Sequence, residues 1–208
     1  MFDFVSKHLG AVDGVVFDFG GVIVAMPDDD WPIYGFCERH GLPREKTKAG
    51  IAKYRRSADN GDISIADIYR FAFRDAGLAE PYPGFGDDAA AIDSEGFTRF
   101  LPETLALIRE LKALGRKIGL LSNMSELFYK EYYLRRAAHI RALLDAEAIS
   151  SNHRLSKPDR AIYDLAARMM GLPPERLLFL DDTPANVEAA RAYGWRAEVY
   201  ALPRAGNA

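Results

Sequence analysis

The chain has 208 residues, of which 49% are hydrophobic and 27% are charged, and its formal net charge is −3. This composition is typical of a globular chain with one sizeable core and a smaller lobe, and it excludes the basic surface of a nucleic-acid-binding protein. Cys37 is the only cysteine, which excludes an internal disulfide and a cysteine metal cluster.

The N-terminal residues do not combine a basic start with a long apolar segment. The apolar run of residues 15–24 is too short and too charged to span a bilayer. A single cysteine also suits a reducing compartment. We therefore expect a cytoplasmic protein with neither a membrane nor a nucleic acid as partner.

Short apolar runs and amphipathic stretches alternate along most of the chain. The runs predict strands within residues 14–20, 116–125, 146–153, 176–186 and 195–201. Between them, the stretches 102–115, 159–171 and 184–194 predict helices; in the first, Leu105, Ile108, Leu111 and Leu114 recur at three-residue steps before a Gly stop. This order predicts an α/β fold, a Rossmann-like and mostly parallel sheet flanked by helices.

Residues 25–98 interrupt the alternation. They contain several helical patterns and turn-rich stretches but no convincing strand. We expect an inserted helical cap domain over residues 25–98, placed where it could cover the active edge of a core domain formed by residues 1–24 and 99–208.

Polar side chains lie at or just beyond the carboxyl ends of the predicted strands, which a parallel sheet brings to one edge. They comprise a carboxylate, a hydroxyl with nearby amides, a lysine and an acidic pair suited to magnesium. Phosphoryl transfer needs such groups for in-line attack and for neutralising the phosphoryl oxygens. The residues are Asp18, Ser122 with Asn123, Lys157, and Asp181 with Asp182.

Four segments resemble, in order, the motifs of the haloacid dehalogenase-like hydrolase superfamily: VVFDFGGVI, LLSN, SKPDRAIY and LFLDDTPAN. The resemblance covers nearly the whole chain, and the insertion after the first motif is similar to the helical cap of subfamily I. It implies a magnesium-dependent hydrolase with a small phosphorylated molecule as substrate.

The resemblance also implies a role for each matching residue. Asp18 would be the nucleophile that forms an aspartyl-phosphate, Ser122 and the Asn123 backbone would hold the phosphate, and Lys157 would stabilise Asp18 and the transferring group. Asp182, helped by Asp181, would bind Mg²⁺ together with Asp18 and the carbonyl of Gly20. Asn186 would orient these ligands.

Some of these residues also have structural interpretations. Ser122 could simply cap a following helix, and Lys157 could be a solvated surface lysine. One acid of the Asp181–Asp182 pair could favour the N-terminus of the next helix. Three neighbouring carboxylates repel one another without a cation, which is the physical argument for the metal.

Gly20 departs from the pattern, because phosphatases of this superfamily commonly carry a second Asp two residues after the nucleophile. A subgroup with the motif FDxGxVI resembles phosphatases of anomeric sugar phosphates such as alpha-D-glucose 1-phosphate, whose leaving group needs less help from an acid. Two alternatives remain open: a metal-independent 2-haloacid dehalogenase, and a binding or regulatory protein of the same fold.

The predicted cap should determine substrate specificity, because the residues at the sheet edge contact only the phosphate. One of Asp28, Asp29 and Asp30 could supply the acid missing at Gly20. The side chains considered for contact with a sugar or a second anion are Trp31, Tyr34, Phe36, Tyr54, Arg55 and Arg56, although aromatic residues at helical spacing usually pack a core.

Overall fold

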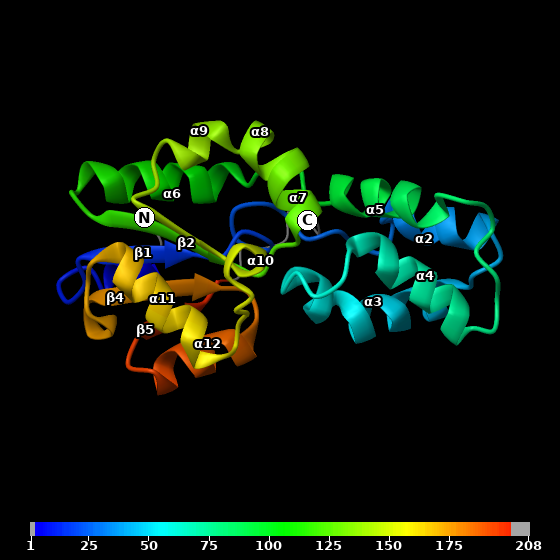
Figure 1. Cartoon of the computed structure of the whole chain (residues 1–208). Helices are drawn as coiled ribbons and strands as arrows, with labels where there is room; N and C mark the ends of the chain where they lie inside the picture. The colour runs from blue at the N-terminus through cyan, green and yellow to red at the C-terminus, as the bar shows by residue number, and fades with distance from the viewer. Residues whose placement is uncertain (1–2, 201–208) are drawn as a thin grey trace.

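A five-stranded parallel sheet organises the chain in the computed structural model, which describes residues 3–200 (Figure 1). Its strands are β1 (Gly14–Phe17), β2 (Lys117–Ser122), β3 (Ala146–Ile149), β4 (Leu177–Asp181) and β5 (Arg196–Val199). The strand order is β3-β2-β1-β4-β5, and all four neighbouring pairs are parallel. From β1 the chain adds β2 and β3 on one side of the sheet and then β4 and β5 on the other. Ligands of α/β folds bind where the strand order reverses in this way, which here is at the carboxyl ends of β1, β2 and β4.

The helices fall into two groups, one between β1 and β2 and one after β2. The first group is α2 (Pro32–Arg39), α3 (Arg44–Asp59), α4 (Ile65–Asp75), α5 (Phe85–Glu95) and α6 (Pro102–Ala113), preceded before β1 by the short α1 (Asp3–Ser6). The second group is α7 (Glu126–Phe128), the π-helix η1 (Tyr129–Tyr133), α8 (Leu134–Arg136), α9 (Ala138–Arg141), α10 (Ser150–His153), α11 (Arg160–Met170), the 3₁₀-helix η2 (Pro174–Arg176) and α12 (Pro184–Ala192).

Both faces of the sheet are buried, as near-continuous apolar strands require. Val15 and Phe17 of β1 point to the face that α6 covers, where they join a core with Ile108. Val16 points to the opposite face and packs with α11 and α12 through residues such as Ile162. The alternation along β1 therefore places helices on both faces, as Figure 1 shows.

Helices α2–α5 form a separate helical lobe beside the sheet (Figure 1). They bury their own apolar cluster, in which Phe85 is fully buried and packs against Phe36 and Phe73 with ring centroids 5.1 and 4.8 Å apart. The capping box of Ser64 and Asp67 begins α4. The lobe thus has an apolar core of its own, apart from the clusters on the two faces of the sheet.

Two chain segments connect the lobe to the sheet, and they lie side by side. The amide of Ala25 donates to the carbonyl of Arg99 at 2.9 Å, and the amide of Leu101 donates to the carbonyl of Ile23 at 2.9 Å. Val24 and Phe100 form an antiparallel bridge between them. We call this pair of segments, residues 23–25 and 99–101, the double connector.

The α/β fold predicted from the alternating pattern is confirmed. Each of the five predicted regions contains one strand, but the first strand ends at Phe17, and the region 146–153 is half strand and half helix α10. Residues 25–98, all of which the structure describes, contain helices and no strand. The ends of the predicted core domain, residues 1–2 and 201–208, lie outside the described residues. None of the helices within 3–200 combines the length and the apolar character needed to cross a bilayer.

Candidate active site

The carboxyl edge of the sheet brings together the polar residues singled out in the sequence. Asp18 follows β1 directly, Ser122 is the last residue of β2, and Asp181 is the last residue of β4. All three side chains are buried. The strands are parallel and adjacent, so residues more than a hundred positions apart in the chain meet at one edge.

Lys157 supplies the positive charge at this edge. Its Nζ lies 2.9 Å from Oδ1 of Asp18 and 2.6 Å from Oδ2 of Asp181, and the side chain is 1% exposed. Burial alone would lower the pKa of Lys157, but Asp18 and Asp181 outweigh it and raise the pKa above its usual value. Lys157 is therefore a charged partner of two carboxylates, and the interpretation as a solvated surface lysine is wrong.

Asp18 is held in a defined orientation but is short of positive charge. The amide of Phe19 donates to its Oδ1 at 2.7 Å, beside the lysine. Burial raises the pKa of Asp18 to about 7; Lys157 lowers it and Asp181 raises it further. A carboxylate that acts as a nucleophile at neutral pH needs an additional cation here.

Asp18, Asp181 and Asp182 form a group that fits a divalent cation. Each offers a carboxylate oxygen, and these oxygens lie within 4.8 Å of one another. When ionised, these three carboxylates carry more negative charge than Lys157 balances. Burial and the neighbouring Asp181 accordingly raise the pKa of Asp182. Carboxylate oxygens are the ligands that Mg²⁺ prefers, and the donor set therefore fits this ion.

Asp181 has the most hydrogen-bond and ion-pair partners of the three carboxylates. Besides Lys157, it accepts hydrogen bonds from the amide of Thr183 at 2.8 Å and from Nδ2 of Asn186 at 3.1 Å. Asp182 accepts a longer bond, 3.3 Å, from the hydroxyl of Thr183. The carboxylates of Asp18 and Asp182 are thus freer to bind a metal, while Asp181 holds Lys157 and is itself oriented by Asn186.

The absence of a side chain at Gly21 leaves the space that the Asp182 carboxylate occupies. Gly21 is not among the site residues predicted from the sequence. Its φ of +74° lies in the left-handed region, and a Cβ there would be 2.0 Å from Oδ2 of Asp182. At Gly20, by contrast, a Cβ would meet only the sulfur of Met26, at 3.1 Å. Of the two glycines after Phe19, the second is the one that the geometry requires.

Asn123 fixes the loop that carries Lys157. Its Nδ2 donates to the carbonyl of Lys157 at 3.0 Å, and its Oδ1 accepts the Lys157 amide at 2.8 Å. Ser122 ends a strand and is not the cap of the next helix; Ser125 caps α7 by accepting the amide of Phe128. The sequence gives no local signal for the Asn123 contact, because its partner lies 34 residues away.

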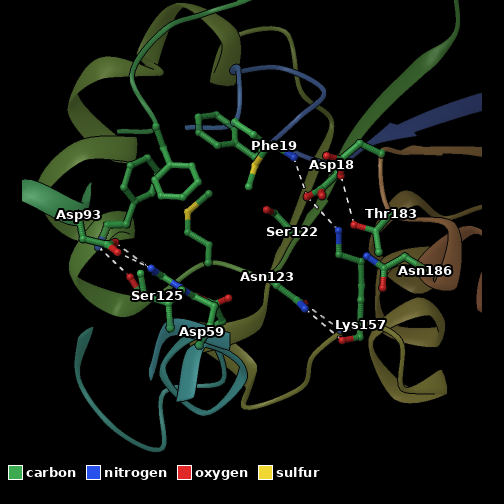
Figure 2. Close-up of a pocket in the computed structure, with 18 of the residues that line it drawn as sticks. Asp18, Phe19, Asp59, Asp93, Ser122, Asn123, Ser125, Lys157, Thr183 and Asn186 are labelled. Carbon is green, nitrogen blue, oxygen red and sulfur yellow. Dashed lines mark hydrogen bonds and ion pairs between the residues drawn. The ribbon is translucent and has the colours of Figure 1, made fainter. Parts of the chain in front are cut away.

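These residues form one wall of a cavity of about 320 Å³ between the sheet and the helical lobe (Figure 2). Of the lobe residues considered for substrate contact, Trp31 and Arg55 line the cavity; Tyr34, Phe36, Tyr54 and Arg56 do not. The exposed residues 28–30 are also absent from its lining. The acids that the lobe contributes are instead Asp59 and Asp93, which the sequence analysis missed.

Asp93 and Arg55 neutralise each other within the lobe wall. Both terminal nitrogens of Arg55 donate to the Asp93 carboxylate, which is 2% exposed and also accepts the hydroxyl of Tyr69 at 2.5 Å. The Arg55 guanidinium lies 5.9 Å from the ring centre of Trp31. The Arg55 guanidinium is thus neutralised by Asp93 and does not offer an unpaired positive charge to a ligand in the cavity.

The fold and the site together define a hydrolase of known type: residues 12–194 match the haloacid dehalogenase-like hydrolase family, and the chain belongs to that family. Phosphatase MT3486 of Mycobacterium tuberculosis (strain CDC 1551 / Oshkosh) is 28% identical over 201 residues, which cover 95% of this chain and 90% of that protein. An (S)-2-haloacid dehalogenase of Pseudomonas putida is 25% identical over 138 residues, which cover 65% of this chain and 58% of that protein.

Solved structures share the fold at lower sequence identity. A haloacid dehalogenase family enzyme of Bacteroides thetaiotaomicron, crystallised with magnesium and inorganic phosphate, superposes with a TM-score of 0.72 at 17% identity. The match covers 94% of this chain and 96% of that one. The predicted family and fold are thereby confirmed, and the chain is a hydrolase.

Proposed function

We propose that this hydrolase is a magnesium-dependent phosphatase of a small phosphorylated metabolite, a sugar phosphate, and that the reaction passes through an aspartyl-phosphate on Asp18. The observation that carries the proposal is the cluster of Asp18, Asp181 and Asp182 around the buried cation of Lys157. A phosphate ester is already anionic, so a site with this excess of carboxylates binds it well only with a divalent cation in place.

The residues divide the chemistry between them. Asp18 attacks the phosphorus atom in line with the leaving oxygen, and Lys157 holds Asp18 and neutralises a phosphoryl oxygen. The Ser122 hydroxyl and the backbone of Asn123 bind other phosphoryl oxygens. Asp18, Asp182 and the carbonyl of Gly20 would hold Mg²⁺, which would neutralise charge on the transferring group.

The helical lobe acts as the cap that encloses the rest of the substrate. Trp31 offers an aromatic surface to a sugar ring, and the Arg55–Asp93 pair offers a nearly neutral polar surface. A neutral polyhydroxylated group fits this wall better than a second anion does, because Arg55, whose guanidinium lines the cavity, is already paired with Asp93.

The dehalogenase alternative fits the site less well. A dehalogenase without metal would place its carboxylate substrate beside Asp181 and Asp182, and like charges at this distance repel. A binding protein without activity would have no physical reason to keep a buried lysine between two carboxylates, because such charges are costly to desolvate.

A panel of metabolite phosphates, assayed with and without Mg²⁺, tests the proposal. We expect phosphate release that requires Mg²⁺ and that Asp18→Asn abolishes, with an anomeric sugar phosphate preferred over glucose 6-phosphate. Chloride release from 2-chloropropionate in the presence of a chelator would establish the dehalogenase instead. Inactivity over the whole panel, together with tight binding of a protein, would establish the binding role.

A further inference from the structure

Four aspartates line the cavity in the described part of the chain: Asp18, Asp59, Asp93 and Asp182. Asp18 and Asp182 belong to the metal-binding group, and Asp93 is occupied by Arg55 and Tyr69. The half-buried carboxylate of Asp59 accepts no hydrogen bond from any residue between 3 and 200. It is therefore the acid in this cavity that is available to a bound substrate.

The backbone of Asp59 is anchored to the sheet. Asp59 ends α3, and its carbonyl accepts the hydroxyl of Ser150, whose oxygen in turn accepts the amide of Met124 at 2.8 Å. Met124 lies two residues after Ser122. The carboxyl end of α3 is therefore held beside the loop that follows β2, at the phosphate side of the cavity.

A second contact ties the same turn of α3 to the loop that carries Lys157. Arg56 pairs with Asp159 at 2.8 Å, two residues beyond Lys157. In Figure 2, Asp59 accordingly lies between Asp93 of the lobe and Lys157 of the sheet domain. A leaving group that extended from the sheet edge through the cavity toward the lobe would pass this carboxylate.

The surroundings of Asp59 adjust its proton affinity. The charged groups that act on it are Arg55 of the same helix, Asp93 of α5 and Lys157 from the loop before α11. Burial raises the pKa of Asp59 to about 7, with Asp93 acting in the same direction and the two cations opposing it. A group with this pKa exists in both protonation states near neutral pH, as general acid and base catalysis requires.

We propose that Asp59 is the general acid and base of the reaction, in place of the side chain that is absent at Gly20. This inference rests on the proposed phosphatase function. In the first step Asp18 Oδ bonds to phosphorus, the bond from phosphorus to the ester oxygen breaks with its electron pair on oxygen, and the Asp59 proton passes to that oxygen. In the second step water attacks phosphorus, Asp59 takes a water proton, and the bond to Asp18 breaks to restore its carboxylate and release phosphate.

Asp59→Asn, assayed as the full chain with Mg²⁺, separates the two steps through the leaving group. p-Nitrophenolate leaves without a proton, so the first turnover of p-nitrophenyl phosphate should stay within about threefold of wild type. Steady-state turnover should fall by about 10²–10⁴-fold, because Asp59 no longer activates water in the second step. The fast first step should then appear as a burst of p-nitrophenolate equal in amount to the enzyme. With glucose 6-phosphate, the first turnover should itself fall by about 10²–10⁴-fold, without a burst.

Two further variants complete the test. Asp29→Asn, an exposed acid outside the cavity, should behave as wild type. Gly20→Asp has room beside the flexible Met26, and in the Asp59→Asn background it should restore turnover of glucose 6-phosphate. Equal loss of both first turnovers in Asp59→Asn, or no loss, would overturn the role of Asp59. A wild-type protein that hydrolyses neither ester with Mg²⁺ would instead overturn the proposed function.

Discussion

Charge pairing divides the aspartates that line the cavity, together with Asp181 behind them, into two kinds. Asp18 and Asp181 contact Lys157, and Asp93 contacts Arg55. Asp59 and Asp182, in contrast, form no ion pair within 4 Å in the part of the chain that the structure describes. A carboxylate without an ionic partner binds a ligand without first breaking an ion pair, which is why we propose Asp182 as a contact for the metal and Asp59 as a contact for the leaving group.

The free carboxylate of Asp59 also lowers stability at alkaline pH. A pKa of about 7, raised from 3.8, means that the folded state holds the proton more tightly than the unfolded state does, so stability falls as pH rises from about 4 to 7. We expect Asp59→Asn, without metal, to unfold about 2–4 °C above wild type at pH 8, the shift that about 1 kcal/mol causes in a chain of this length.

This difference in Tm should shrink as the pH is lowered toward 5, and calorimetry at a series of pH values measures it. Asp29→Asn is the matched control, because Lys48 lowers the pKa of this exposed carboxyl and its replacement brings no stability at pH 8. An Asp59→Asn protein that is less stable than wild type at pH 8 would contradict the prediction.

At the scale of single elements, the turn after β1 and the turn after β4 fit together as one unit. The first turn reverses the chain at Gly21, whose amide donates to the carbonyl of Val24 at 2.8 Å, and the second turn presents Asp182 into the space that Gly21 leaves. The position of the Asp182 carboxylate thus depends on a residue that has no side chain.

Replacing each glycine of the turn with alanine separates their roles. Gly21→Ala should lose about 1–2 kcal/mol through the left-handed backbone, and it should weaken Mg²⁺ binding by about tenfold or more because the new methyl displaces Asp182. Gly20→Ala should keep Mg²⁺ affinity within about threefold, since its Cβ meets only the end of Met26. Isothermal titration calorimetry with MgCl₂ measures both affinities. Equal Mg²⁺ affinities in Gly21→Ala and Gly20→Ala would refute the argument that a methyl group at position 21 displaces Asp182.

The elements of the sheet could be predicted because their signals are local. Four apolar strands followed by polar residues indicate both the parallel sheet and the residues Asp18, Ser122 and Asp181 at its edge. Asp59 and Asp93 could not be predicted, because each looks like an ordinary acid on an amphipathic helix. Their burial arises only when α3 and α5 both pack against α4 and face the sheet, and no local pattern encodes that arrangement.

At the scale of the whole molecule, three apolar clusters divide the chain. Two lie on the two faces of the sheet, and the third lies within α2–α5. The double connector, the hydroxyl of Ser150 and the Arg56–Asp159 pair link this third cluster to the sheet. Between the two parts, α3 also contacts α10, and Phe97 packs against Phe128. Because these contacts are few beside those within each part, the lobe and the sheet should open separately.

Phe85→Ala tests this separation. The fully buried ring packs against four aromatic neighbours of the lobe, and its loss should cost about 3–5 kcal/mol. Hydrogen exchange measured by mass spectrometry should become about 100-fold faster or more in α2–α5, while β1, β2 and β4 keep their rates. Ile108→Ala, in the core between α6 and the sheet, is the matched control and should accelerate exchange in the strands. If Phe85→Ala also accelerated exchange in β1, β2 and β4, the lobe and the sheet would unfold as one cooperative unit, which would contradict the prediction.

The double connector has a consequence for protein engineering. The amide of Ala25 and the carbonyl of Arg99 are hydrogen-bonded across an antiparallel pair, so a tight turn of two residues spans the gap between them. The chain can therefore be rejoined at this point without stretching either segment. We therefore expect residues 26–98 to be a removable cassette: a lobe from a related hydrolase, joined at this point, should leave the register of the sheet unchanged.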